Sequence, residues 1–284
     1  MNDSAQTPEK LGVGTREWDD HCDTHGPYRA RGFELNGKRM GGRCPNCQRE
    51  RDAEEQSNQE AKKRAAKAKR VERLLGSAGI PPRFLGRTFE NFRVEPGNQG
   101  QAKALRLCKA YADRFDDAMA SGACAVLIGP PGTGKTHLAA AIAQAIIPTG
   151  RSVHFTTVSR LVRRVKSTYS QEADETEEQA IRAYRIPDLL ILDEVGVQRG
   201  TETERLILTD VLGLRYEHMS PTVVLGNCSE PELAAHLGDR VVSRLQEGGG
   251  PFVVCNWLDY RTKVHADDGL PRRKVPPVDW EGPP

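Results

Sequence analysis

The chain has 284 residues, a formal net charge of +2 and 7 cysteines. Its length allows one fair-sized domain with smaller pieces, and the balanced charge neither requires nor excludes a nucleic-acid partner. The odd, unevenly spaced cysteines are not typical of a secreted disulfide framework. No stretch is apolar for long enough to cross a bilayer, and the first ten residues lack a signal-peptide core. We therefore expect a cytoplasmic protein with no membrane partner.

A small zinc-binding ribbon is predicted over residues 18–50, after a polar and disordered tail over residues 1–17. Two pairs of metal-binding residues have the same spacing, and they are Cys22, His25, Cys44 and Cys47. Two knuckles at this separation supply four tetrahedral ligands, which makes a closed, structural site. His21 is an alternative ligand, but only His25 gives the symmetrical spacing. Asn36-Gly37 indicates a hairpin between the knuckles, and reduced cysteines on a loop are the alternative interpretation.

A charged helical linker is predicted over residues 51–77, which are dense in Glu, Gln, Lys, Arg and Ala. Its run from Ala61 to Arg70 is markedly basic, which suits an arm for a partner or for DNA, although a merely solvated linker fits equally well. A nucleotide-binding domain is predicted over residues 78–264. The Pro- and Arg-rich residues 265–284 are expected to be a second disordered tail.

Residues 129–136 read Gly-Pro-Pro-Gly-Thr-Gly-Lys-Thr, which is the phosphate-binding P-loop pattern. An apolar strand-like run over 123–128 precedes them and a helix-like stretch over 137–146 follows. The glycines allow backbone N–H groups to wrap round a phosphate at a helix N-terminus. Lys135 would place a cation on the β- and γ-phosphates, and Thr136 would offer a hydroxyl to Mg²⁺. We assign the ATP contacts to Gly129, Pro130, Pro131, Gly132, Thr133, Gly134, Lys135, Thr136 and His137.

The apolar run Leu189–Leu192 ends in Asp193 and Glu194, which is typical of a buried parallel strand with a Walker B acidic pair. Asp193 would hold Mg²⁺ directly or through water, and Glu194 would orient and deprotonate the attacking water. Further strands are predicted over 152–157, 222–226 and 252–257, and helices over 99–119, 158–169, 172–182, 203–218, 232–237 and 238–245. This alternation predicts an α/β fold with a parallel sheet flanked by helices.

Two other polar signals are weaker. Asn227 follows the strand 222–226, where a side chain faces the ligand crevice of a parallel sheet, although a helix-capping Asn would look the same. Arg240 and Arg244 stand four residues apart on one helix face and would reach a nucleotide in cis or across a subunit interface. Two solvated surface arginines give the same pattern.

Taken together, residues of about 78–264 resemble the DnaC-type bacterial replicative helicase loaders of the AAA+ superfamily. The resemblance rests on several segments, which are 79–84, 89–92, 129–136, 189–196, 221–227, 238–245 and the ending Asn256-Trp-Leu-Asp-Tyr-Arg261. The cysteine–histidine segment resembles the zinc-binding region of a subset of these loaders, including phage and prophage versions.

The resemblance implies a role for each matching residue. Lys135 and Thr136 match Walker A, Asp193 and Glu194 match Walker B, and Asn227 matches the sensor 1 position. Arg240 matches an arginine finger that acts in trans, and Arg244 matches a second arginine that joins the nucleotide contacts. Loaders also carry a helical insertion that binds single-stranded DNA, and residues 158–184 occupy its place. The candidates there combine cations with a stacking ring, and they are Arg163, Arg164, Lys166 and Tyr169.

The resemblance therefore implies an ATPase that loads the replicative, DnaB-type helicase and uses ATP, Mg²⁺ and Zn²⁺. It would bind single-stranded DNA, form a homo-oligomer when ATP is bound, and contact the helicase through its N-terminal region. An IstB-like transposition helper that acts on duplex DNA is an alternative. A non-catalytic module that nucleotide merely stabilises is another, but the intact Lys135, Thr136, Asp193 and Glu194 argue against it. A small-molecule kinase would need a lid and an acceptor pocket that the sequence lacks.

Overall fold

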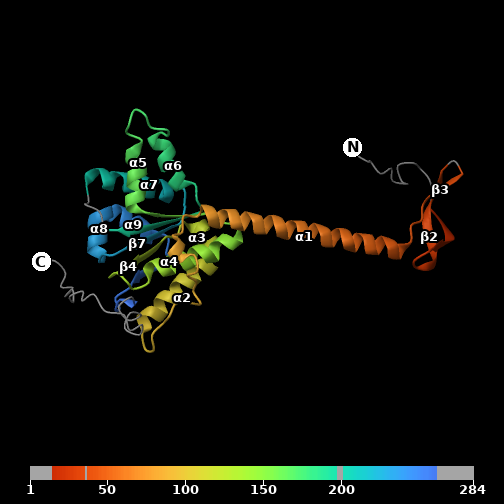
Figure 1. Cartoon of the computed structure of the whole chain (residues 1–284), viewed down its shortest axis with the longest axis horizontal. Coiled ribbons are helices and arrows are strands. Elements are labelled where there is room, and N and C mark those ends of the chain that lie inside the picture. The colour runs from red at the N-terminus through yellow and green to blue at the C-terminus, as the bar shows by residue number, and fades with distance from the viewer. Residues whose placement is uncertain (1–14, 36, 197–200, 261–284) are drawn as a thin grey trace. The chain divides into compact units, whose positions relative to one another are not determined.

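The structure is a computed structural model that describes residues 15–35, 37–196 and 201–260. The chain divides into two compact units, Met1–Lys69 and Arg70–Pro284, whose elements are labelled in Figure 1. The predicted tails lie outside the described residues, except for residues 15–17. None of the helices in the described part of the chain has the length and apolar character that a membrane span requires.

The first unit contains a three-stranded antiparallel sheet in the order β1-β2-β3. Its strands are β1 (Arg16–Cys22), β2 (Gly26–Leu35) and β3 (Lys38–Gly41). The Trp18 ring packs so closely on the backbone that a Cβ added to Gly42 would lie 2.7 Å from its Cζ2. Trp18 itself is only half-buried, and the buried apolar side chains of this unit are those of Ala30 and Cys44. So small a core is consistent with the expectation that a metal helps this sheet to fold.

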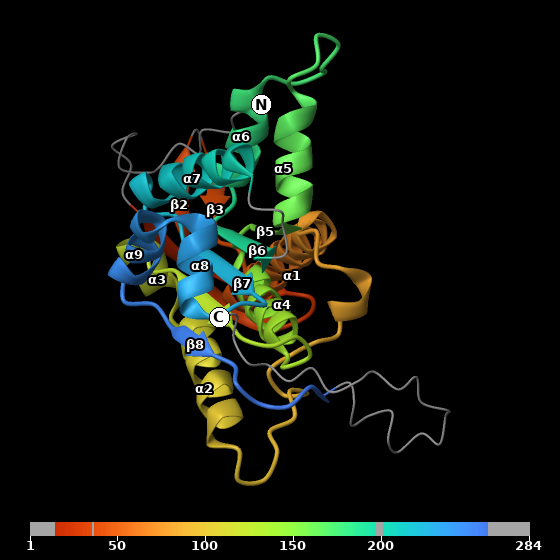
Figure 2. The same cartoon turned by 90° about the vertical axis from the view of Figure 1, so that its left-hand side faces the viewer.

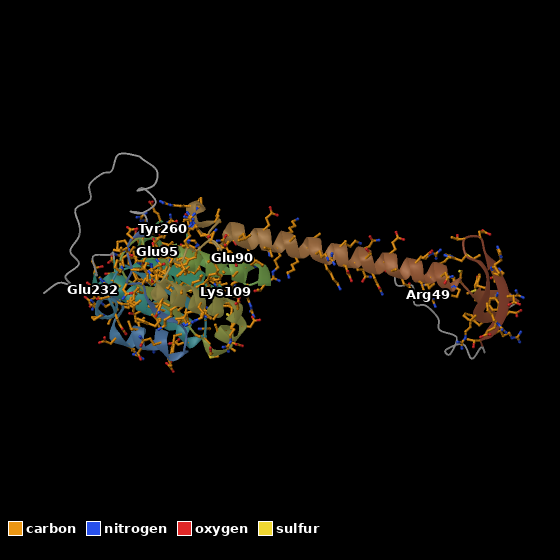
Figure 3. The ribbon with its side chains drawn as sticks, turned by 90° about the horizontal axis from the view of Figure 1, so that it is seen from below. Arg49, Glu90, Glu95, Lys109, Glu232 and Tyr260 are labelled. Carbon is orange, nitrogen blue, oxygen red and sulfur yellow. The ribbon has the colours of Figure 1, made fainter. Side chains whose placement is uncertain are left out.

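Helix α1 spans Pro45–Ser77 and belongs to both units. It begins six residues before the predicted linker, with proline at the first helical position, where the missing N–H is no loss. None of its residues is buried, and side chains such as Arg49 point away from the helix (Figure 3). In the second unit, Arg70 Nη2 donates to the Gly150 carbonyl at 3.0 Å, and Leu74 packs against the core.

The second unit is built on a parallel five-stranded sheet in the order β5-β6-β7-β4-β8. The strands are β4 (Ala125–Ile128), β5 (Val153–Thr157), β6 (Leu189–Val195), β7 (Thr222–Gly226) and β8 (Phe252–Val254). Alternate strand residues pack into two cores. The end of α1 with α2, α3 and α4 covers one face of the sheet, and α5 to α9 cover the other (Figure 2). The predicted α/β fold is confirmed.

The helices of this unit follow the predicted order. They are α2 (Gln99–Asp113), α3 (Phe115–Ser121), α4 (Lys135–Ile146), α5 (Val158–Ser167), α6 (Glu177–Arg185), α7 (Glu202–Glu217), α8 (Glu230–Leu237) and α9 (Asp239–Glu247), with short 3-10 turns η2 (Pro82–Phe84) and η3 (Ile147–Thr149). The single helix predicted over 99–119 is wrong, because the chain leaves the helical conformation at Arg114. The helix predicted from Glu172 begins only at Glu177, since Thr176 and Gln179 form a capping box.

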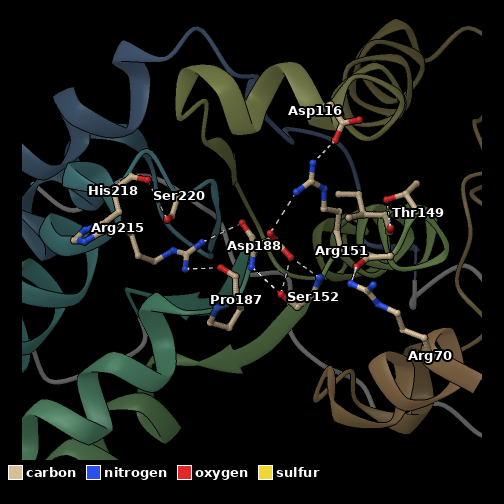
Figure 4. Close-up of polar contacts among 12 residues, drawn as sticks. Arg70, Asp116, Thr149, Arg151, Ser152, Pro187, Asp188, Arg215, His218 and Ser220 are labelled. Atoms are coloured by element: carbon tan, nitrogen blue, oxygen red, sulfur yellow. Dashed lines mark hydrogen bonds and ion pairs between the residues drawn. The ribbon is translucent and has the colours of Figure 1, made fainter. Parts of the chain in front are cut away.

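Arg215, near the end of α7, is a buried cation at the amino ends of β6 and β7 (Figure 4). Its guanidinium donates to oxygens from two segments, 184–188 and 221–222, which are the carbonyls of Tyr184, Arg185, Pro187, Asp188 and Pro221 and the hydroxyl of Thr222. Burial lowers its pKa to about 10, so the side chain stays charged at neutral pH. Next to it, the Asp188 carboxylate accepts hydrogen bonds from the backbone N–H and the hydroxyl of Ser152.

Candidate functional site

The P-loop connects the end of β4 to the start of α4 and has the backbone shape that its glycines permit. Gly129, Gly132 and Gly134 have φ angles of 133°, 78° and 89°, a region that side-chained residues rarely enter. The loop thus curls over the N-terminus of α4, where unpaired N–H groups and the helix dipole favour an anion. The predicted strand, loop and helix context of the motif is present.

Lys135 lies within the curve of this loop and is only 5% exposed. Its Nζ donates to the carbonyl oxygens of Gly129 at 2.7 Å and Pro130 at 2.6 Å, and contacts the Thr133 hydroxyl at 3.3 Å. A buried ammonium that lies among backbone dipoles at the N-terminus of a helix is suited to bind a multiply charged phosphate.

Thr136 lies in the first turn of α4 and Asp193 lies in β6, and a hydrogen bond joins their side chains. The Thr136 hydroxyl donates to Asp193 Oδ2 at 3.0 Å, so the two oxygens predicted to bind Mg²⁺ lie side by side. Burial raises the pKa of the Asp193 carboxyl, and a divalent cation would offset that effect by favouring the carboxylate. Hard oxygen donors at this spacing fit Mg²⁺ that also retains water ligands.

Glu194 stands next in the chain with a φ of +64°, which is uncommon for a residue with a side chain. Its N–H donates to Asp193 Oδ1 at 2.7 Å, and the pairing of β6 with β7 is irregular between Leu192 and Val195. The chain therefore bends where the acidic pair lies. Strained backbone of this kind costs on the order of 1 kcal/mol and is concentrated at functional sites.

Asn227 is exposed directly after β7, and β7 lies between β6 and β4 in the sheet. Because the strands are parallel, Asn227 lies at the same edge of the sheet as Asp193 and the P-loop. The structure thus places Lys135, Thr136, Asp193, Glu194 and Asn227 at one edge, as the sequence patterns predict.

Three other predicted residues lie differently. His137 Nε2 is 2.8 Å from the Thr88 carbonyl and its ring packs edge-on against Phe92, so the side chain faces the segment before α2. Arg244 stacks on the Tyr216 ring at 4.7 Å. It lines a small cavity with Cys124, which precedes β4 and so lies at the edge of the sheet opposite to the P-loop. Arg244 therefore lies away from the P-loop of its own subunit. Arg240 is exposed on α9, where it makes no ion pair with any described residue.

The candidate DNA-binding residues on and after α5 are mostly paired with acidic side chains. Arg164 donates two hydrogen bonds to Glu175, each at 2.8 Å, which raises the pKa of the guanidinium. The Tyr169 hydroxyl donates to a carboxylate of Glu177 at 3.1 Å, and Lys166 lies 3.9 Å from a carboxylate of Glu204. Arg163 is exposed and makes no ion pair with a described residue, so its charge is the most accessible of the three cations.

The four predicted zinc ligands converge in the first unit. Cys22 ends β1, His25 lies in the turn before β2, and Cys44 and Cys47 flank the start of α1. One ligand atom of each lies within 4.8 Å of the others. Cys47 Sγ is 3.4 Å from Cys22 Sγ and 3.3 Å from His25 Nδ1, and Cys22 Sγ and Cys44 Sγ are each 3.8 Å from His25 Nδ1. Ligands about 2.3 Å from a tetrahedral ion are roughly 3.7 Å apart, so this donor set fits zinc.

The surroundings of the cluster also favour a metal. Backbone hydrogen bonds from His25 and then Thr24 lower the pKa of the Cys22 thiol to about 6, which favours the metal-binding thiolate. His25 Nε2 lies 3.0 Å from a Glu50 carboxylate oxygen, which is the usual way to orient a ligating imidazole through its second nitrogen.

Replacing Cys44 with serine is expected to lower bound zinc and to loosen the small sheet, because metal binding would supply much of the folding energy of so small a unit. Metal content by mass spectrometry and protease sensitivity of the first unit would measure this. A Cys108→Ser variant is the matched control, since Cys108 is buried in the second unit. Full metal content in Cys44→Ser would show that the ligand set is wrong.

Residues after β8 reach the P-loop in a way that the sequence patterns do not reveal. Trp257 and Tyr260, the latter labelled in Figure 3, bond to carbonyls of the loop. Their segment, Asn256-Trp-Leu-Asp-Tyr260, contributes to the family resemblance. Its residues form no pattern that predicts a contact with the P-loop. Only the position of β8 beside β4 explains why it lies there.

Comparisons with known proteins place the chain in an ATP-binding family, which agrees with the P-loop geometry. The chain matches the family described as IstB-like ATP binding protein over residues 52–245. The replicative helicase loader DnaC of Buchnera aphidicola subsp. Baizongia pistaciae is 35% identical over 209 residues, which are 74% of this chain and 83% of that protein. The replicative helicase loader DnaC of Escherichia coli K12 is 35% identical over 204 residues, which are 72% and 81%. A crystal structure of the DnaC helicase loader is 25% identical, covers 61% of this chain and 99% of its own, and has a TM-score of 0.54.

Proposed function

Since this chain belongs to the IstB-like ATP-binding family and is a P-loop AAA+ ATPase of the DnaC type, we propose that it loads the replicative DNA helicase in an ATP-dependent manner. The observation that carries this proposal is the meeting of Lys135, Thr136, Asp193 and Glu194 at one edge of the sheet, in a chain 35% identical to replicative helicase loaders. In this proposal the ribbon covers residues 18–50, the linker 51–77 and the ATPase domain 78–264, and the protein acts in the cytoplasm.

Each residue of the ATP site has a defined task in this proposal. Lys135 binds the β- and γ-phosphates, and Thr136 and Asp193 hold Mg²⁺, which neutralises phosphate charge when bound. Glu194 orients the attacking water and accepts its proton. Asn227, at the same edge, senses the γ-phosphate. The accessible side chain of Arg240 completes the site of a neighbouring subunit, which requires a homo-oligomer when ATP is bound.

Single-stranded DNA is proposed to bind along residues 158–184. Arg163 is the strongest of the four candidates, because the carboxylates of Glu175, Glu177 and Glu204 already neutralise or bond the others. A stacking role remains open to Tyr169, whose side chain is 55% exposed, since its hydroxyl bond leaves the ring face available.

The decisive experiment is a pull-down of the purified full-length protein with its host's replicative helicase, in the presence of ATP or ADP. We expect a stable complex with the wild type, and at least a tenfold loss in Cys44→Ser if the ribbon forms the contact. The Cys108→Ser variant should bind like the wild type. Absence of any complex, together with ATP-dependent filaments on duplex DNA, would contradict the loader proposal and favour a transposition helper.

A further inference from the structure

A short strap, defined as residues Cys255–Tyr260, follows β8 and lies beside the P-loop. The Cys255 N–H donates to the carbonyl of Ile128 at 2.7 Å, where β4 ends. The Trp257 indole N–H donates to the Thr133 carbonyl at 2.9 Å, and the Tyr260 N–H donates to the Gly132 carbonyl at 3.1 Å. The strap thus bonds three carbonyls at or beside the loop.

Each of these bonds fixes the direction of the next N–H group in the loop. A trans peptide is planar, so its C=O and N–H point in opposite directions, and the described residues contain no cis peptide. The bond from Trp257 to the Thr133 carbonyl therefore directs the Gly134 N–H toward the opposite side. The bond from Tyr260 to the Gly132 carbonyl directs the Thr133 N–H in the same way. These are N–H groups that a phosphate in the loop would use.

The loop needs such support because glycine flanks both peptide planes and allows them to rotate. Two side chains restrict the same glycines. The Asp259 carboxylate lies where a Cβ on Gly132 would be, and the Phe92 ring lies 2.8 Å from the Cβ position of Gly134. Lys135 cannot replace the strap, because it bonds the carbonyls of Gly129 and Pro130 instead and its ammonium must turn to a phosphate that enters.

We propose that Trp257 is a positioning residue for nucleotide binding, which holds the Thr133–Gly134 peptide so that its N–H faces the phosphate. This inference rests on the proposed ATP-binding function and extends it to a segment with no previously assigned task. Tyr260 supports the adjacent peptide through its backbone. The indole ring also packs against Gly100 of α2, so the position of the strap is fixed from both sides.

The test is the Trp257→Phe variant of the full-length protein, which keeps an aromatic ring but removes the N–H donor. Loss of one hydrogen bond predicts an affinity for MgATP about three- to tenfold weaker, with a KM raised to the same extent and kcat unchanged, since Asp193 and Glu194 are untouched. Fluorescence titration with a labelled ATP and steady-state hydrolysis measure both. Leu258→Ala is the matched control, because this strap side chain is 76% exposed.

A purely structural role would lower the thermal stability of the protein without nucleotide and leave the KM of the folded fraction unchanged, which would overturn the inference. So would MgATP affinity in Trp257→Phe equal to that of Leu258→Ala. If Trp257→Phe does not fold, Tyr260→Pro, which removes the second donor, must show the weakened affinity instead. The proposed function itself would be overturned by a different result, which is a wild-type protein that binds MgATP no more tightly than Lys135→Ala does.

Discussion

The Lys135→Ala variant is expected to lose ATP binding in the range where the wild type is saturated. The ammonium is the buried cation of the P-loop, and its removal leaves the phosphate charge without a partner in a partly desolvated site. Truncation of one partner in a buried charge pair costs about 3 kcal/mol or more, which is roughly a hundredfold in affinity. Isothermal titration with MgATP measures this directly.

The matched control for Lys135→Ala is Glu194→Gln, which changes charge at the same edge of the sheet. Because Glu194 is proposed to act on the water and not on the phosphates, this variant should bind ATP like the wild type. Its hydrolysis rate should fall about a hundredfold to a thousandfold, as expected when a general base is lost. Equal nucleotide affinity in Lys135→Ala and the wild type would contradict the assignment of the P-loop.

The second large effect is expected from Arg215→Leu, which should destabilise the ATPase domain by at least about 3 kcal/mol. Leucine fills part of the space but leaves the carbonyls around Arg215 without their donor. Several buried acceptors lose partners at once, and these acceptors hold the end of α6 and the starts of β6 and β7. Urea denaturation followed by circular dichroism gives the free energy of unfolding.

Arg215→Lys separates the charge of this residue from its geometry. Lysine keeps the positive charge but has one nitrogen in place of the planar guanidinium. It can therefore donate to only some of the oxygens that surround Arg215. Its loss of stability should be clearly smaller than that of leucine and still measurable. Surface substitutions typically change the free energy of unfolding by less than about 0.5 kcal/mol. A change this small in Arg215→Leu would show that water replaces the guanidinium.

Much of the ATPase fold could be predicted because buried parallel strands are uniform apolar runs. Leu189–Leu192 and Thr222–Gly226 have this character, and both are strands in the structure. The P-loop is equally local, since its glycines, Lys135 and the following helix are consecutive. The order of the strands was not predictable, because nothing in the spacing shows that β8 pairs with β4.

The features that the sequence did not reveal depend on residues far apart in the chain. Arg215 looks like an ordinary exposed helix residue until the carbonyls of Pro187 and Pro221 are placed around it. Strand β1 is hidden because Arg16 and Asp20, which share a face with Trp18, are charged and leave no apolar alternation, although Trp18 packs on the sheet. In the same way, the pairing of Arg164 with Glu175 follows from the fold of the α5–α6 connection and not from the basic pattern that suggests DNA contact.

The position of β4 between β7 and β8 determines when the nucleotide site can form during protein synthesis. Val126 pairs with Phe252, so about 126 residues separate the two partners. At roughly 5–20 residues per second, the ribosome needs on the order of 6–25 seconds to make the second after the first. For most of that interval the P-loop motif exists, but its strand lacks both neighbours, β7 and β8, and its loop lacks the strap. We therefore expect ATP to stabilise the nascent domain only late in synthesis, after its last strand has emerged.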